Sequence, residues 1–421
     1  MHEMPTAAPV PLSPEGSLPH PVFITAVRGL TAVLELQPML TSFAARCGQL
    51  GAVDYLEYFL TGPYVGPKTP CLFLVHSDPG ARSPSAVKPE HLLGAVLLYE
   101  YRVRGLDTKV YVTDDDGGER TVLAPAEVRL RLAAEVAQSL IQKGARMVLL
   151  SVRSEETLNF IGKHAPSARR GKPLMWASRE RTMRRTLALQ STFDETLAPM
   201  GKHTRRNLRA ARRRAEADLD AVFVPAAQIS LEEFMALNRL CSYPVPDRVS
   251  VWRYETAAKI PGGFIAGVLS RNGHWLCLLG GRRHHRVTEI GWQMNREDLE
   301  AYSPRNVMRS FLLDHEISLG TGKIYFEGGT AHSMQSAFTS DRVMDLLVSS
   351  RSLSAALLRR YAPALLPPKN LLAEILTDQH LKWRFTGEDT DRELDTPGLA
   401  SWPPRQQTSG SIARASLQSV G

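Results

Sequence analysis

The stretch 303–330 combines a helix start with a short strand, an arrangement in which a helix start could bind an anion. Ser303 suits the N-cap of a helix and Pro304 suits its first position. The first amides of a helix have no partner within it, and together with the helix dipole they attract phosphate or carboxylate groups. An ordinary helix cap explains the same two residues. The sequence therefore leaves a cap and an anion site as alternatives.

Two glutamates at predicted strands, Glu289 and Glu327, have the chemistry of a general base. A carboxylate takes a proton from an attacking amine or hydroxyl either directly or through a water molecule. Tyr302 and His332 flank the same helix start, Tyr302 as a third catalytic candidate and His332 as a candidate for substrate binding. Most strand carboxylates near turns are only solvated, and that interpretation stays open for both glutamates.

The segment 201–214, "GKHTRRNLRAARRR", concentrates the positive charge of the chain. It holds seven Lys/Arg and no acidic residue, so only about +1 of the formal net charge of +8 comes from elsewhere. A thin apolar stripe predicts a helix with most of its surface in solvent or against a charged partner. Such a partner would be a nucleotide, a lipid diphosphate or tRNA. The candidate binding residues are Lys202, Arg205, Arg206 and Arg209.

The second half of the chain predicts three strands, a helix and a fourth strand, in that order. The strand-length runs are 263–270, 274–281 and 286–295, and Asn272-Gly273 between the first two is a strong hairpin signal. The helix follows at 303–319, with Gly320 or Gly322 to end it, and the fourth strand at 323–328. This order predicts a meander whose last strand is linked through a helix to a further strand.

The first half repeats the same order, with strands at 71–77, 91–103 and 108–113, a helix at 125–143, Gly144 and a strand at 145–152. Repetition of a whole supersecondary unit predicts two copies of one α/β domain. The expected boundaries are a disordered leader 1–20, a non-catalytic N-terminal domain 21–190, a C-terminal domain 191–340 that includes the basic helix 201–216, amphipathic helices in 341–386, and a disordered tail 387–421.

Composition and missing motifs exclude several classes of protein. A length of 421 residues suits two domains, and 43% hydrophobic with 22% charged residues is an ordinary globular profile. The longest apolar runs are too short for a membrane helix, and the N-terminus lacks a secretory signal. The four cysteines form no CxxC pair, which favours a reduced cytoplasmic compartment and no metal. GxSxG, P-loop, dinucleotide-binding and HExxH motifs are all missing.

A meander followed by a helix and a strand, present twice and joined by an arginine-rich helix, resembles the GNAT-fold acyltransferase superfamily. The likeness is carried by "GKHTRRNLRAARRR", "SPRNVMRSFLLDHEISLG" and "KIYFEGGT" in that order, and it is closest to the double-GNAT branch of CelD-like and Fem-type transferases. The resemblance implies an α/β fold of two tandem GNAT-like domains, with mixed, mostly antiparallel sheets flanked by helices and a C-terminal helical extension.

The resemblance also implies a function and a site. The expected activity is transfer of an acyl group, with acetyl as the first expectation, from acetyl-CoA or another acyl-CoA to an amine or hydroxyl on a sugar or a cell-envelope or exopolysaccharide precursor. The donor diphosphate would lie on the amides of the segment Ser303, Arg305, Asn306 and Val307. Gln293, Met294 and Asn295 would supply the backbone N–H that polarises the thioester carbonyl. Direct attack would require no metal.

The chain departs from the family pattern at two places. "EAYSPRN" stands where the family has an Arg/Gln-x-x-Gly-x-Gly/Ala loop, and "TAHSMQSAF" stands where CelD-like proteins tend to have Tyr-Lys. In the first copy, the acidic segment 114–116 would repel phosphate, which favours the second copy as the donor site.

Two other functions stay open. A Fem-type aminoacyl-tRNA-dependent transferase would use the basic helix to bind RNA. A catalytically inactive GNAT-fold module would instead bind a synthase or make peripheral membrane contact through the basic helix and the C-terminal helices.

Overall fold

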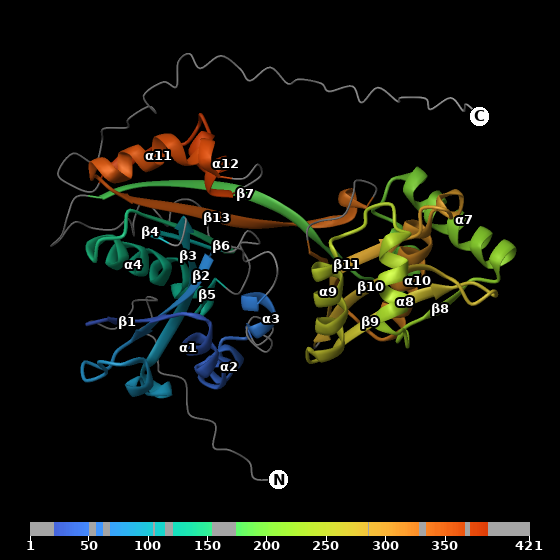
Figure 1. The fold of residues 1–421 in the computed structure, drawn as a ribbon, viewed down its shortest axis with the longest axis horizontal. Coiled ribbons are helices and arrows are strands. Elements are labelled where there is room, and N and C mark those ends of the chain that lie inside the picture. The colour runs from blue at the N-terminus through green and yellow to red at the C-terminus, as the bar shows by residue number, and fades with distance from the viewer. Residues whose placement is uncertain are drawn as a thin grey trace, which may run out of the picture.

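The computed structural model describes residues 21–49, 56–61, 68–103, 106–113, 121–153, 174–284, 286–327, 334–366 and 371–385. They form two α/β lobes joined by two long strands (Figure 1). The predicted leader 1–20, tail 387–421 and acidic segment 114–116 lie outside the described residues.

The chain passes through the first lobe and then the second, and its C-terminal helices return to the first (Figure 1). The elements of the first lobe are β1 (Phe23–Arg28), α1 (Leu30–Glu35), α2 (Gln37–Arg46), α3 (Leu56–Thr61), β2 (Lys68–His76), β3 (Leu92–Val103), β4 (Leu106–Val112), β5 (Val122–Leu123), α4 (Arg129–Gln142), β6 (Met147–Arg153) and β7 (Leu174–Ala188). The second lobe has α6 (Phe193–Leu197), α7 (Lys202–Leu219), β8 (Val222–Val224), α8 (Leu231–Arg239), α9 (Asp247–Lys259), β9 (Gly263–Leu269), β10 (Trp275–His284), β11 (Val287–Asn295), η5 (Glu300–Tyr302), α10 (Pro304–Ser318), β12 (Lys323–Phe326) and β13 (Phe338–Ser350). They are followed by α11 (Leu353–Leu365), α12 (Leu371–Thr377) and β14 (Arg384–Phe385).

All the described strands belong to one sheet. Its order is β1-β2-β3-β4-β6-β13-β7-β12-β11-β10-β9-β8, with β5 beside β3 and β14 beside β7. The pairs β4–β6 and β11–β12 are parallel, and every other described pairing is antiparallel. Each half of the sheet therefore has a three-stranded meander followed by a helix and a parallel strand. This order confirms the prediction of an α/β chain with two tandem GNAT-like units.

The two halves exchange their last strands. β7 follows the first unit in sequence but pairs with β12 of the second, whereas β13 follows the second unit but pairs with β6 of the first. β7 and β13 also pair with each other along most of their length. The exchange makes the sheet continuous from one lobe to the other, as Figure 1 shows.

The prediction of amphipathic helices throughout 341–386 is wrong for its first ten residues. Residues 341–350 belong to β13, where the run from Val343 to Ser349 is buried without a break. A strand covered on both faces has a continuous apolar sequence, which periodicity cannot distinguish from a short buried helix. α11 and α12 follow as a helical extension, and the first of them begins at Leu353.

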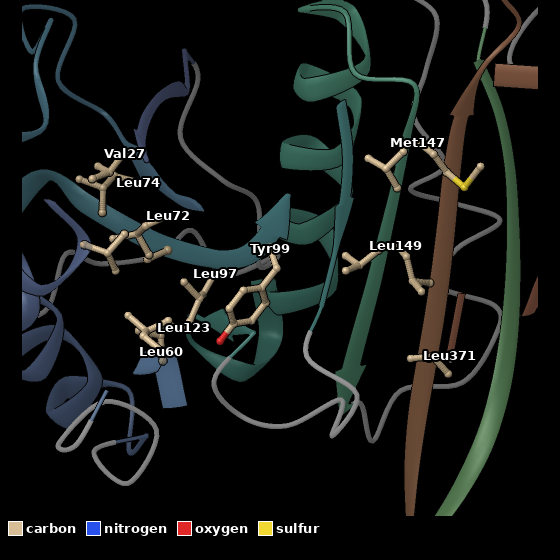
Figure 2. Packing of buried hydrophobic residues seen from close by; sticks show 14 of the residues in the cluster. Val27, Leu60, Leu72, Leu74, Leu97, Tyr99, Leu123, Met147, Leu149 and Leu371 are labelled. Atoms are coloured by element: carbon tan, nitrogen blue, oxygen red, sulfur yellow. The ribbon is translucent and has the colours of Figure 1, made fainter. Parts of the chain in front are cut away.

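The first lobe has a hydrophobic core on each face of its sheet. On one face of the sheet, side chains such as Leu72, Leu97 and Leu149 pack beneath α1 and α2, and Leu371 of α12 joins the same cluster (Figure 2). The side chains on the other face pack against α4. Because β strands alternate their side chains, covering both faces requires helices on both sides.

The second lobe has the same layered arrangement. α7 and α10 cover one face of its sheet, through Leu208, Ala211, Val307 and Leu312. α8 and α9 cover the other face, through Phe234 and Ala257.

Candidate functional site

The strands β11 and β12 part after four residue pairs. Their parallel pairing runs from Val287 opposite Lys323 to Ile290 opposite Phe326. The last link is the Glu327 N–H, which donates to the Ile290 carbonyl at 2.9 Å. Beyond it, among the described residues, β11 pairs with β10 as far as Asn295, whose carbonyl also accepts the Ser242 N–H at 3.2 Å. Within the described part of the chain, β11 and β12 therefore part at Gly291.

A β-bulge lies where the two strands part. Gly281 pairs with Ile290 and Gly280 pairs with Trp292, so Gly291 is an extra residue in β11. Ile290 packs in the cluster beneath α10, whereas Trp292 packs in the cluster beneath α8 and α9. A regular strand would place both side chains on the same face. The bulge therefore reverses the orientation of the rest of β11.

Past the bulge, the three predicted carbonyl-polarising residues divide between the two faces. Met294 is buried with Trp292 in the α8–α9 layer. By alternation, Gln293 and Asn295 lie on the α10 side, and the Gln293 amide Nε2 donates to the Asn295 Oδ1 at 2.8 Å. The strands part earlier than predicted, at Gly291, and all three residues lie beyond that point. Their role in polarising a carbonyl stays a prediction.

Sequence reasoning missed the glycine pair opposite the bulge. A Cβ on Gly280 would lie 2.1 Å from the Trp292 ring, and a Cβ on Gly281 would lie 1.9 Å from the Glu289 carbonyl oxygen. Both positions therefore require glycine. Adjacent glycines inside a strand are a known sign of a bulge or of close backbone approach, and this signal was present in the sequence.

The start of α10 differs from the predicted amide cradle. Ser303 is the N-cap, but it has a left-handed backbone (φ 54°), and within the described part of the chain its side chain makes no capping hydrogen bond. Its N–H donates to the Glu300 carbonyl, and its own carbonyl accepts the N–H groups of Asn306 (2.8 Å) and Val307 (3.1 Å). The prediction that Asn306 and Val307 offer free amides is therefore wrong. Of the predicted set, the Arg305 amide remains.

A buried arginine lies one turn further along α10. Arg309 is only 5% exposed, and its Nε and Nη1 have no hydrogen-bond partner among the residues that the structure describes. Burial, and then the positive charge of Arg305, lower the pKa of Arg309 to about 10. Sequence reasoning missed this residue, because an arginine within a helix normally extends into solvent.

A buried arginine with two nitrogens unpaired within the described residues, beside a second arginine, points to an anion. Burying a charge is unfavourable unless a partner compensates it. Arg305 and Asn306 are half-buried, so the start of the helix is partly exposed to solvent. The site thus offers two guanidinium groups, one amide and the positive end of a fifteen-residue helix.

The two candidate glutamates line one small cavity on the opposite face of the sheet. Its walls come from α9, the bulged region of β10 and β11, and the residue after β12. The lining residues are Thr256, Ala257, Ile260, Gly280, Gly281, Arg282, Glu289, Gly291, Trp292 and Glu327. A volume of about 20 Å³ holds a water molecule. Tyr302 is not among the lining residues.

Glu289 is already compensated by two partners on β10. The Arg282 Nε donates to one carboxylate oxygen at 2.7 Å, and the His284 Nε2 lies 3.1 Å from the other. Burial alone would raise the pKa of Glu289, but the hydrogen bond from His284 and the charge of Arg282 outweigh it, and the pKa falls to about 2. Such a carboxylate is a poor general base near neutral pH. Its position instead balances the buried guanidinium of Arg282, which leaves Glu327 as the better candidate base.

The basic helix α7 packs against α10 and runs in the opposite direction. Near its C-terminal end, the Leu219 carbonyl accepts the Arg271 N–H (3.0 Å) from the turn between β9 and β10. The start of α10 lies at the same end of the sheet, because the Cys277 thiol near the start of β10 contacts the Pro304 carbonyl (3.3 Å). Since α7 has 18 residues and is about 27 Å long, its N-terminal arginines are remote from the start of α10.

The N-terminal cations of α7 therefore form a feature separate from the start of α10. Arg209 forms an ion pair with Asp194 of α6, and Arg205 donates to the Ala198 carbonyl. Lys202 and Arg206 are exposed and have no ion pair in the described part of the chain. The predicted strip Lys202–Arg209 is therefore no part of the anion site on α10. His332, the remaining predicted substrate contact, lies outside the described residues.

No family model matches the sequence, and no curated protein matches it. Solved structures that are similar to the chain include L-PGS from Bacillus licheniformis, which is 13% identical, with a TM-score of 0.44 over 76% of this chain and 94% of that one. A tandem GNAT protein from the clavulanic acid biosynthesis pathway is 10% identical, with a TM-score of 0.41 over 79% and 99% of the two chains. FemX is 9% identical, with a TM-score of 0.48 over 79% and 99%.

Proposed function

We propose that this protein is a GNAT-type acyltransferase that binds its donor, an acyl-CoA, by the diphosphate at the start of α10. The observation that carries the proposal is Arg309, a buried arginine beside Arg305 whose Nε and Nη1 have no hydrogen-bond partner among the described residues. A diphosphate supplies the charge and the acceptor oxygens that these two groups and the Arg305 amide lack. The residues present therefore fit the group.

The bulge in β11 supports the acyl-transfer part of the proposal. The donor would lie on the α10 face, where Gln293 and Asn295 are placed, and the acceptor would approach from the cavity beneath α9. Donor and acceptor would meet where β11 and β12 part, after Ile290. In this arrangement the exposed backbone of β11 polarises the thioester carbonyl and Glu327 takes the proton from the attacking group, directly or through the water that the cavity accommodates. CoA supplies the thioester itself.

The acceptor follows from the resemblance rather than from the geometry. An amine or hydroxyl on a sugar or on a cell-envelope or exopolysaccharide precursor is the expected acceptor, and acetyl is the expected acyl group. Glu327 at the acceptor side suits either nucleophile, because both must lose a proton during attack.

Thermal stabilisation tests the donor site. We expect acetyl-CoA and inorganic diphosphate to raise the melting temperature of the wild-type protein, and Arg309→Met to abolish both shifts. Arg271→Met is the matched control, because this arginine is 80% exposed and lies outside the site. No shift with any acyl-CoA would refute the proposal and leave an inactive binding module. A shift that persists in Arg309→Met would refute the role of this residue.

A second candidate is favoured by the exposed cations of α7. Lys202 and Arg206 are unpaired within the described residues and remote from the donor site, as a separate RNA-binding surface would require. An aminoacyl-tRNA-dependent transferase would bind tRNA with an affinity that falls steeply with salt, and Arg206→Glu would flatten that dependence. Stabilisation by tRNA but not by acyl-CoA would favour this candidate over the first.

A further inference from the structure

The helix α11 exposes an apolar stripe to solvent. Leu353 is 76% exposed, Leu357 48% and Tyr361 52%. These residues are four positions apart, so they lie along one face of the helix. The opposite face, with Ala355 and Ala362, is buried against the first lobe. Among the described residues, this helix contributes three of the eight large hydrophobic side chains that are exposed.

The same face is positively charged. Arg360 lies between Leu357 and Tyr361 on the exposed side, and its guanidinium is 5.8 Å from the centre of the Tyr361 ring. Arg351 is exposed just before the helix. Between Asp345 and Glu374 the sequence has three arginines, one lysine and no acidic residue. The stripe therefore combines leucine and tyrosine side chains with cations and has no negative charge of its own.

α11 is also placed where a flat surface can reach it. It lies over β7 and β13 at the outer side of the first lobe, and no other labelled element covers it in Figure 1. In the described part of the chain no helix is long and apolar enough to cross a bilayer. Contact with a membrane through α11 would therefore be interfacial.

We propose that α11 is an interfacial helix that seats the first lobe on an anionic lipid surface. Leucine side chains enter the boundary of the acyl chains, tyrosine occupies the headgroup level, and arginines pair with lipid phosphates, which is the residue pattern of such helices. A protein partner fits less well, because a stable interface needs about 20 residues a side and α11 offers a narrow convex stripe. Because the stripe carries arginine and no acidic residue, it should bind an anionic lipid surface more tightly than a neutral one.

Vesicle flotation tests this proposal with the full-length protein. We expect binding to phosphatidylcholine–phosphatidylglycerol vesicles, little binding to phosphatidylcholine alone, and release as salt is raised. Combined Leu353→Ser and Leu357→Ser should weaken binding about tenfold or more, and Arg360→Glu should weaken it further. Leu240→Ser is the matched control, because Leu240 is 52% exposed but lies in the second lobe. Unchanged melting temperatures would show that the variants fold.

Several outcomes would overturn the proposal. Wild-type protein that binds neither kind of vesicle would do so, and so would a double serine variant that binds as tightly as the control. If sedimentation showed a dimer that the serine substitutions dissolve, and no vesicle bound, the stripe would be a contact between two copies of the chain. Since α11 is not part of the donor site, loss of vesicle binding should leave stabilisation by acetyl-CoA unchanged.

Discussion

Replacing Arg309 by methionine is expected to stabilise the protein and at the same time to remove donor binding. Methionine has a similar length and fills the same space without a charge. Arg309 is 5% exposed, and two of its guanidinium nitrogens have no partner among the described residues. In the absence of an anion, its charge therefore opposes folding.

The size of this effect follows from the pKa. Burial and the charge of Arg305 lower the pKa of Arg309 to about 10. The fall from the ordinary value of arginine, at about 1.4 kcal/mol per pH unit, corresponds to about 3 kcal/mol of unfavourable free energy at neutral pH. Because neighbours relax around a new side chain, the expected gain on substitution is about 1–3 kcal/mol.

Chemical denaturation with and without acetyl-CoA measures both halves of the prediction. Arg309→Met should raise the unfolding midpoint of the free protein without changing the slope, and acetyl-CoA should no longer raise it further. Arg282→Met is the contrasting control. That guanidinium is also buried but pairs with Glu289, so its loss should destabilise the protein by about 3 kcal/mol or more.

The reasoning would be refuted if Arg309→Met destabilised the free protein as Arg282→Met does. That result would mean that Arg309 has a favourable partner in the folded state. Retained stabilisation by acetyl-CoA in the same variant would refute the role of Arg309 in donor binding as well. A stabilised variant that still binds the donor would agree with the unfavourable burial of the Arg309 charge but would show that Arg309 does not bind the donor.

Three further predictions concern the bulge and its carboxylates. Glu289 has a folded pKa of about 2, below the ordinary value of 4.5, so its stabilising contribution is full only well above pH 4.5 and is lost as the pH falls towards about 2; Glu289→Gln should flatten this part of an acid-unfolding curve. Glu327→Gln should lower kcat for acyl transfer by about 100-fold or more with little change in melting temperature, whereas an unchanged kcat would exclude Glu327 as the base. Gly280→Ala should destabilise the second lobe by about 1–3 kcal/mol because its Cβ meets the Trp292 ring, and adding Trp292→Leu should recover part of the loss in thermal unfolding.

Local chemistry was enough to predict the repeated unit. The hairpin at Asn272-Gly273, the start of α10 at Pro304 and its end before Gly320 each depend on residues next to one another. Their geometry is set by turn chemistry, by the fixed φ of proline and by the freedom of glycine at positive φ. Since both halves of the chain carry these signals in the same order, the amino-acid sequence alone predicts the two-unit fold.

Part of the site was within reach of the sequence. Once the hairpin between β10 and β11 is in register, Arg282 lies directly opposite Glu289, and such cross-strand ion pairs are common. Recognising the bulge at Gly280-Gly281 would also have led to the prediction that β11 and β12 part at Gly291. Both features depend on contacts within one hairpin.

Other features of the fold and of the site depend on tertiary contacts alone. The mostly apolar sequence of residues 343–349 is compatible with either a helix or a strand. Its pairing with β6, almost 200 residues earlier in the chain, makes it a strand. Arg309 and Arg206 are both helical arginines in sequence, but packing buries one and leaves the other in solvent. The sequence by itself determined the elements and their order, because these depend on neighbouring residues. Strand exchange and the unpaired buried charge depend on which distant segments come together, and only the folded chain decides that.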